Sequence, residues 1–213
     1  MHISFMSKAY FLAIFLLSAF FTGCLAADIH ESNAENSSIA HWSFDEGEGN
    51  IAYDGTYNLP NSGNGNDGSV SGAQWVEGVS NYALKFDGTD DYVKIDDDDM
   101  LDFTDELSIL FWVNASDLDQ TYQQIIRKGG SDDHIEIQFN GNKLRADVGC
   151  YECNRIDSET LSENTWYHVA VVRTDSKLLL YIDSVLHAQK NITSDDLTNS
   201  YDLYIGKDPY HSN

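Results

Sequence analysis

The chain has 213 residues, with 12 lysine or arginine residues against 35 aspartate or glutamate residues and a formal net charge of -23 at pH 7. This length leaves room for one domain with a substantial core after removal of a leader. The negative charge repels phosphate backbones and anionic lipid headgroups, and it therefore excludes nucleic acid as an expected partner.

Residues 1–26 are typical of a secretory leader. Lys8 precedes an apolar stretch at residues 9–21, which has the length of a signal peptide and is short for a membrane span. The next residues end in Thr-Gly-Cys24, which resembles a bacterial lipobox with phenylalanine in place of the usual leucine. Two routes remain open: lipidation of Cys24 with cleavage before it, or ordinary cleavage after residue 26 or 27. Both predict a secreted or cell-surface protein without a transmembrane span in the mature chain.

Residues 27–38 are expected to form a flexible tether, because they are rich in Asn, Ser and Glu and contain few apolar side chains. The domain follows at residues 39–213. Short apolar runs recur in it between Gly, Asn and Asp clusters, and no long amphipathic helix pattern occurs. The runs predict ten strands, at residues 40–44, 83–86, 92–95, 107–113, 124–128, 135–139, 144–148, 166–173, 178–182 and 201–205.

Two hairpins can be recognised among these strands. Residues 135–139 alternate apolar and polar side chains, and an Asn-Gly turn connects them to residues 144–148. Residues 166–173 and 178–182 are largely apolar, which indicates buried strands, and the polar turn Thr-Asp-Ser followed by Lys177 lies between them. Ten short strands with such turns predict an all-β fold of two packed antiparallel sheets. Six aromatic residues are expected to fill the space between the sheets: Trp42, Phe44, Phe86, Phe111, Trp112 and Trp166.

Six local patterns also follow one another in a fixed order. They are AHWSFDEG at 40–47, NGNDG at 64–68, ALKFDGTDDYV at 83–93, LSILFWV at 107–113, WYHVA at 166–170 and LYIG at 203–206. Together they resemble the laminin G-like jelly-roll domains of the concanavalin A-like lectin and glucanase superfamily over residues 39–207. The resemblance implies a two-sheet antiparallel jelly-roll sandwich that acts as an exported binding or adhesion module, with a glycan or a cell-surface protein as its partner.

The resemblance also implies a missing strand. Domains of this family usually continue after the Tyr-Ile-Gly strand into a last strand that pairs beside the first one. The sequence ends at Asn213 without such a strand. We therefore expect a jelly roll truncated at its C-terminus, with an open edge at residues 40–44.

No catalytic pattern is found in the sequence. The β-glucanases of the superfamily carry Glu-x-Asp-x-Glu or Glu-x-Asp-x-x-Glu on one strand, because alternate residues of a strand share a face and hydrolysis needs paired carboxyl groups. Glu136 lies on a predicted strand but has no aspartate two residues later. We expect no enzyme activity. Two alternatives to a glycan-binding module are a structural surface-layer interaction protein and the accessory module of a glycoside hydrolase whose catalytic part is absent.

Loops at one rim of the sandwich are expected to contact the ligand, because rigid sheets present variable loops. The predicted loops cover residues 58–72, 117–122 and 149–158. Within them we predict ligand contacts for Tyr122, Tyr151 and Asn154.

Calcium is the cofactor that the sequence favours. Loop aspartates supply the hard oxygen ligands that Ca²⁺ prefers, and extracellular modules can hold the ion weakly. The family resemblance points to Asp45 and Asp87 as ligands of a structural Ca²⁺. The alternative is that these residues form turns and a solvated acidic rim.

Two of the three cysteines remain after the leader is set aside. Cys150 and Cys153 form an even pair in an oxidising compartment, which predicts a local disulfide. The same spacing occurs in redox motifs and in half of a zinc site. Neither fits, because the chain has no second cysteine pair and no βαβ pattern.

Overall fold

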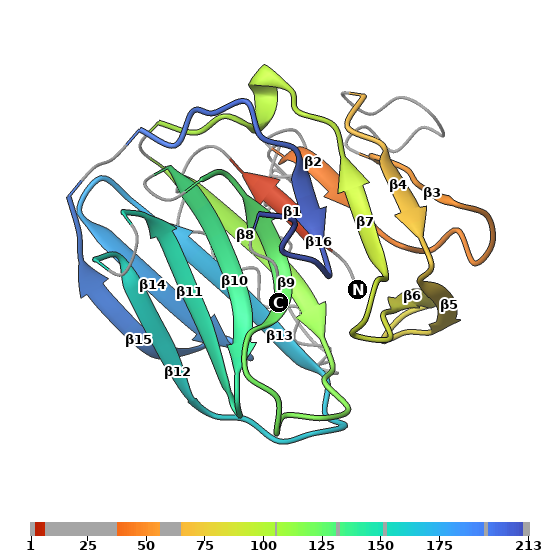
Figure 1. Cartoon of the computed structure of the whole chain (residues 1–213). Coiled ribbons are helices and arrows are strands. Elements are labelled where there is room, and N and C mark those ends of the chain that lie inside the picture. The colour runs from red at the N-terminus through yellow and green to blue at the C-terminus, as the bar shows by residue number, and fades with distance from the viewer. Residues whose placement is uncertain are drawn as a thin grey trace, which may run out of the picture.

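The structure is a computed structural model that describes residues 3–6, 38–55, 65–104, 106–130, 133–150, 153–193 and 196–210. These residues form two large antiparallel sheets with a shared apolar core, together with a small two-stranded sheet (Figure 1). The predicted all-β jelly-roll sandwich is confirmed.

One sheet has six strands. Their order is β15 (Val185–Asn191), β14 (Lys177–Ile182), β13 (Tyr167–Arg173), β8 (Leu107–Val113), β1 (Ile3–Met6) and β2 (Ser38–Trp42). The predicted hairpin around Thr-Asp-Ser is β13 and β14. It lies inside the sheet, between β8 and β15.

The other large sheet has eight strands. Their order is β12 (Arg155–Thr160), β11 (Lys143–Gly149), β10 (His134–Asn140), β9 (Gln123–Lys128), β16 (Leu203–Ile205), β7 (Tyr92–Ile95), β4 (Gly68–Ser71) and β3 (Ile51–Ala52). The predicted Asn-Gly hairpin is β10 and β11, with seven residue pairs in register.

The remaining elements are short. Strands β5 (Gln74–Glu77) and β6 (Tyr82–Lys85) form the two-stranded sheet, and the 3-10 helix η1 covers Asp99–Leu101. The Asp98 carboxylate accepts a hydrogen bond from the Met100 backbone N–H and caps η1. Within the described residues, no helix combines the length and the apolar character that a membrane crossing requires.

The core lies between the two large sheets. Alternate residues of facing strands supply it, because successive side chains of a strand point to opposite faces. Ile109 and Phe111 of β8 pair with Val171 and Val169 of β13, and all four are buried. Burial of one such side chain contributes roughly 1.5–3 kcal/mol. Burial of the apolar runs of the sequence thus stabilises the packing of the two sheets.

A buried lysine on β9 connects three segments of the chain. The ammonium group of Lys128 is fully buried and lies 2.8 Å from the Asp97 carboxylate. It also donates to the side-chain oxygen of Asn199 and to the backbone oxygen of Tyr201, each at 3.0 Å. These bonds hold the chain before η1 and the chain before β16 against β9.

All ten predicted strands are present, but six further strands were not predicted. They are β1, β3, β4, β5, β12 and β15. β4 and β12 each contain a single large aliphatic residue, and their pairing partners rather than their own patterns determine them. The loop predictions at residues 58–72 and 149–158 are corrected accordingly, because β4 and the start of β12 lie within them.

The edge that we expected to be open is paired. Strand β1 forms antiparallel ladders with β2 on one side and with β8 on the other (Figure 1). Its residues belong to the segment that the sequence predicts to be a leader. The far edge of β2 is covered by residues 54 and 55, since the Gly55 N–H donates to the His41 carbonyl oxygen at 2.8 Å.

Candidate functional site

The outer face of the eight-stranded sheet is unusual because it buries polar side chains. On β10, His134, Glu136 and Gln138 alternate with the core residues of the same strand, and all three are buried. A half-buried strand would leave these positions in water. This part of the outer face is therefore covered.

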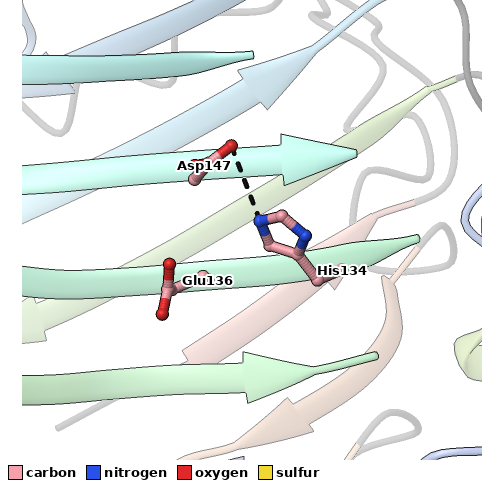
Figure 2. Close-up of side chains that lie close together, drawn as sticks. All are labelled: His134, Glu136 and Asp147. Carbon is pink, nitrogen blue, oxygen red and sulfur yellow. Dashed lines mark ion pairs between the residues drawn. The ribbon is translucent and has the colours of Figure 1, made fainter. Parts of the chain in front are cut away.

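His134 and Glu136 of β10 come together with Asp147 of β11 across the β10–β11 hairpin (Figure 2). Glu136 lies directly opposite Asp147 in the ladder. Nε2 of His134 lies 3.5 Å from Oδ1 of Asp147, and one ligand atom from each of the three residues lies within 4.8 Å of the others. The cluster contains a nitrogen and two carboxylates, a donor set that suits either an ion-pair network or a metal ion.

An arginine from a neighbouring strand lies beside each of the two carboxylates, Asp147 and Glu136. Nε of Arg155 donates to Oδ2 of Asp147 at 3.0 Å, and Nη1 of Arg127 lies 3.6 Å from Oε1 of Glu136. Glycoside hydrolysis requires one protonated and one ionised carboxyl group in different surroundings. Here each carboxylate faces a guanidinium group, and neither is set apart as the acid. The arrangement fits a charge network better than an acid–base pair.

A groove with a volume of about 1220 Å³ opens on this outer face. Its floor includes Glu136, Gln138, Arg145 and Arg155 of strands β10, β11 and β12. Residues within 86–91, 113–123 and 206–209 form much of the remaining lining, to which β5, β6, Trp112 and Trp166 also contribute. The groove therefore combines a polar floor on rigid strands with loop walls, the usual construction of a ligand site.

Tyr122 is the exposed aromatic residue of the groove. Its side chain is 60% exposed and it lines the groove, with a backbone φ of 62°. The loop before it is anchored by Leu118, which is buried and donates its N–H to the Glu163 carboxylate at 2.8 Å. Nε2 of Gln123 donates to the Asp117 carbonyl oxygen at 2.8 Å and closes the loop. An anchored loop thus holds an aromatic ring in solvent.

The segment after β16 contributes another part of the lining. Gly206 has a φ of 85°, and a Cβ atom there would lie 2.5 Å from Cδ1 of Phe86, so only glycine fits this close approach. Beyond it, the Lys207 ammonium group lies 4.5 Å from the centroid of the Tyr92 ring. The Tyr210 hydroxyl donates to the Asp202 carbonyl oxygen at 3.1 Å, and burial raises the pKa of Tyr210. These contacts hold residues 206–210 against the outer face.

The structure places only some of the residues that we predicted to contact the ligand. Tyr122 lies in the groove, whereas Tyr151 lies outside the described residues. Cys24, the predicted lipidation site, also lies outside them. Asn154 is only 3% exposed, and its backbone N–H donates to the Cys150 carbonyl oxygen at 3.2 Å.

The predicted disulfide between Cys150 and Cys153 is present and closes the turn between β11 and β12.

The two predicted calcium ligands lie at opposite ends of β6. The Asp45 carboxylate accepts from the Tyr82 N–H at 3.3 Å, at the start of that strand. Asp87 follows its end, where its side-chain oxygen lies within 4.8 Å of those of Asp90 and Asp91. The structure thus groups Asp87 with two neighbours from its own loop and places Asp45 elsewhere. Calcium binding stays a prediction.

Comparison with known proteins identifies a family and similar folds. A family model described as the concanavalin A-like lectin/glucanases superfamily matches residues 87–213. Domain 4 of AbnA, a GH43 extracellular arabinanase from Geobacillus stearothermophilus solved in complex with arabinotriose, has a TM-score of 0.57 and 17% identity, covering 79% of this chain and 82% of that chain. No curated protein sequence matches the chain.

Toxin domains share the same fold. The receptor binding domain of botulinum neurotoxin D has a TM-score of 0.54 and 14% identity, covering 77% of this chain and 45% of that chain. A structure of botulinum neurotoxin type C, whose cell entry depends upon interaction with two ganglioside molecules, has a TM-score of 0.51 and 18% identity, covering 70% of this chain and 40% of that chain. The chain spans less than half of these toxin chains. At such identities the similarity shows the fold.

Proposed function

Because the chain belongs to the concanavalin A-like lectin/glucanase superfamily, we propose that it is an exported, non-catalytic module that binds carbohydrate in the groove on the outer face of the eight-stranded sheet. One observation carries this proposal: the exposed ring of Tyr122 stands beside a floor of fixed polar side chains. Secretion, with or without a lipid on Cys24, follows from the predicted leader. Mass spectrometry of the mature protein tests the lipid.

The groove offers the two kinds of contact that a sugar ring needs. An aromatic ring provides a flat apolar surface for the C–H face of a sugar, and planar polar groups bond its hydroxyls. Nε of Arg145 donates to Asp157 at 2.7 Å, so this floor residue is already oriented before ligand arrives. Pre-organisation of this kind lowers the entropy lost on binding.

The charges of the groove favour a neutral glycan. Its lining contains four cationic residues (Lys85, Arg145, Arg155 and Lys207) and five anionic ones (Asp87, Asp91, Asp117, Glu136 and Asp208). The groove is therefore nearly balanced, although the whole chain carries a formal charge of -23. The arabinotriose bound to the similar arabinanase domain is also an uncharged oligosaccharide, which supports this choice.

The test is carbohydrate binding by variants of two exposed tyrosines. Wild-type protein is titrated calorimetrically with soluble arabinan, xylan and mixed-linkage β-glucan. Tyr122→Ala should weaken binding at least about tenfold, since truncation of a tyrosine that anchors a binding site costs roughly 2 kcal/mol or more and each 1.4 kcal/mol is about tenfold in affinity. Tyr53→Ala is the matched control, because Tyr53 is 41% exposed and does not line the groove. Equal affinity of both variants, or no binding by wild-type protein, would contradict the proposal.

Calcium binding is proposed for the loop after β6. One carboxylate oxygen from each of Asp87, Asp90 and Asp91 lies within 4.8 Å of the others, and carboxylate oxygens are the ligands that Ca²⁺ prefers. Ca²⁺ should raise the thermal midpoint, and Asp90→Asn should abolish the rise. An unchanged midpoint at millimolar Ca²⁺ would leave these residues as turn formers.

A further inference from the structure

A buried amide on the floor of the groove differs from the polar groups around it. Gln138 lies on β10, which runs between β9 and β11 (Figure 1). Its side chain is 4% exposed and lines the groove. Among the residues that the structure describes, none forms a hydrogen bond with the side-chain amide of Gln138. A buried amide without a protein partner costs stability unless water or a ligand bonds it.

The polar side chains beside Gln138 have partners within the protein. Gln124 of β9 lies opposite it in the ladder, and Nε2 of Gln124 donates to two backbone carbonyl oxygens, at 2.7 and 3.3 Å. On β11, Arg145 lies opposite Gln138 and donates to both carboxylate oxygens of Asp157. Glu136, on the same face of β10, lies 3.6 Å from an arginine of β9. The Gln138 amide therefore stands among groups that are already engaged with one another.

We propose that Gln138 determines the specificity of the groove, by recognising two adjacent unsubstituted hydroxyl groups of a neutral glycan. This inference rests on the proposed function. The amide presents a donor, Nε2, beside an acceptor, Oε1. A hydroxyl group both donates and accepts, so one hydroxyl of an adjacent pair accepts from Nε2 while its neighbour donates to Oε1. In the free protein water can bond the amide, since the groove opens to solvent, and the sugar hydroxyls replace it.

The position of the amide suits recognition. Strand β10 is paired on both sides at Gln138, with Gln124 and with Arg145. The side chain is therefore held by packing before ligand arrives, which lowers the entropy lost on binding.

The same chemistry excludes sugars that are substituted at these hydroxyls. A methyl ether or an ester keeps an oxygen that accepts from Nε2, but it has no hydrogen to donate to Oε1. Binding of such a sugar would leave a buried acceptor unpaired, which is costly. The ligand class is therefore a neutral oligosaccharide with free adjacent hydroxyls.

The test compares Gln138→Met with a matched substitution on the other sheet. Methionine is unbranched and apolar like the stem of glutamine, but its thioether forms no strong hydrogen bond. Wild-type protein and both variants are titrated calorimetrically with soluble arabinan, xylan and mixed-linkage β-glucan. Gln138→Met should weaken binding about tenfold, because hydrogen bonds on both sides of the amide are lost and each contributes a few-fold in affinity. Gln189→Met is the control, since Gln189 is exposed on β15, and it should leave binding unchanged.

The thermal midpoint of the ligand-free protein separates recognition from a structural role. Gln138→Met should leave the midpoint unchanged or raise it, because a buried polar group without a partner among the described residues is replaced by an apolar one. An amide that holds the fold together would instead lower the midpoint when it is removed.

O-methylated forms of the same three polysaccharides test the hydroxyl groups directly. Methylation should weaken binding to wild-type protein, and the loss should be smaller for Gln138→Met, since methylation and the substitution remove the same contact.

Three outcomes would overturn the inference. They are wild-type affinity in Gln138→Met, a lowered midpoint of that variant, and an equal loss on methylation in both proteins. Each of them leaves the groove as a carbohydrate site if Tyr122→Ala still weakens binding. Absence of binding by wild-type protein would instead contradict the proposed function, and this inference with it.

Discussion

Strands β10 and β13 both lie inside a sheet, yet their outer faces differ. The outward residues Ala170 and Val172 of β13 are apolar and half-buried. The outward residues Glu136 and Gln138 of β10 are polar and buried. Hydropathy identifies the face that meets the other sheet, but loops from elsewhere decide whether the opposite face is covered. Under the proposed function, the buried polar row of β10 marks the ligand-binding face of the sandwich, and the half-buried apolar row of β13 does not.

Removal of a buried charge from this polar row should have the largest effect. Asp147 is fully buried and pairs with Arg155, so Asp147→Ala should lower the free energy of unfolding by about 3–5 kcal/mol. Urea denaturation followed by tryptophan fluorescence measures the loss. Asp157→Ala is the control, because its carboxylate is 35% exposed, and it should cost about 0–1 kcal/mol. Equal losses would show that the outer face of β10 and β11 is as open as that of β13.

Neighbouring leucines of β14 should separate the two faces of the six-stranded sheet. Leu180 is fully buried, and Leu180→Ala should lower the free energy of unfolding by about 2–5 kcal/mol. Leu179 points to the half-buried outer face, and Leu179→Ala should cost less than about 1 kcal/mol. Chemical denaturation of both variants provides the comparison. A larger loss for Leu179 would mean that this outer face is covered in solution.

Acid should lower the free energy of unfolding because two histidines on the outer face of the six-stranded sheet, His168 and His41, become protonated. Burial lowers the pKa of His168, which contacts the Trp112 ring, and burial also lowers the pKa of His41. The unfolded chain therefore binds more protons just below the ordinary value of 6.5, so this stability is present above that pH and is lost as the pH falls through it. His168→Gln should therefore flatten the dependence of the unfolding free energy on pH below about 6.5, as measured by urea denaturation at a series of pH values. An unchanged slope would contradict the assignment.

A change in salt concentration should have the smallest effect, which concerns the affinity for the glycan. Because the charges of the groove nearly cancel, the dissociation constant for a neutral glycan should change less than about threefold between low and molar salt. Calorimetric titration at the two ionic strengths measures the change. A steep loss of affinity in salt would indicate a charged ligand and a groove whose ion pairs open on binding.

The sandwich can be predicted from the sequence because the core strands have apolar or alternating patterns that identify them as strands. Residues 135–139 and the Asn-Gly turn identify β10 and its partner, and Glu136 and Asp147 lie equally far from that turn, so their contact follows from the hairpin alone. Edge strands are different. β15 is at the edge of its sheet, and its apolar residues Val185 and Leu186 are exposed. Such a strand has no alternating pattern to detect.

The rest of the site depends on contacts between distant segments. Arg127 contacts Glu136 only because β9 and β10 pair. Asp208, in the chain after β16, lies 3.9 Å from Nε of the same arginine. Trp112 was expected between the sheets, but its neighbour Phe111 takes the core position and Trp112 contacts His168 on the outer face. A run that is apolar on both faces does not reveal which of two adjacent aromatics is inside.

Amide hydrogen exchange with and without a bound polysaccharide shows which outer face of the sandwich binds carbohydrate. If the groove is the site, exchange should slow in β9, in β10 and in residues 113–123 and 206–209, which line the groove, and should stay unchanged in β13 and β14. Slower exchange confined to β13, β14 and β15 would instead place the ligand on the six-stranded sheet and overturn the proposed site.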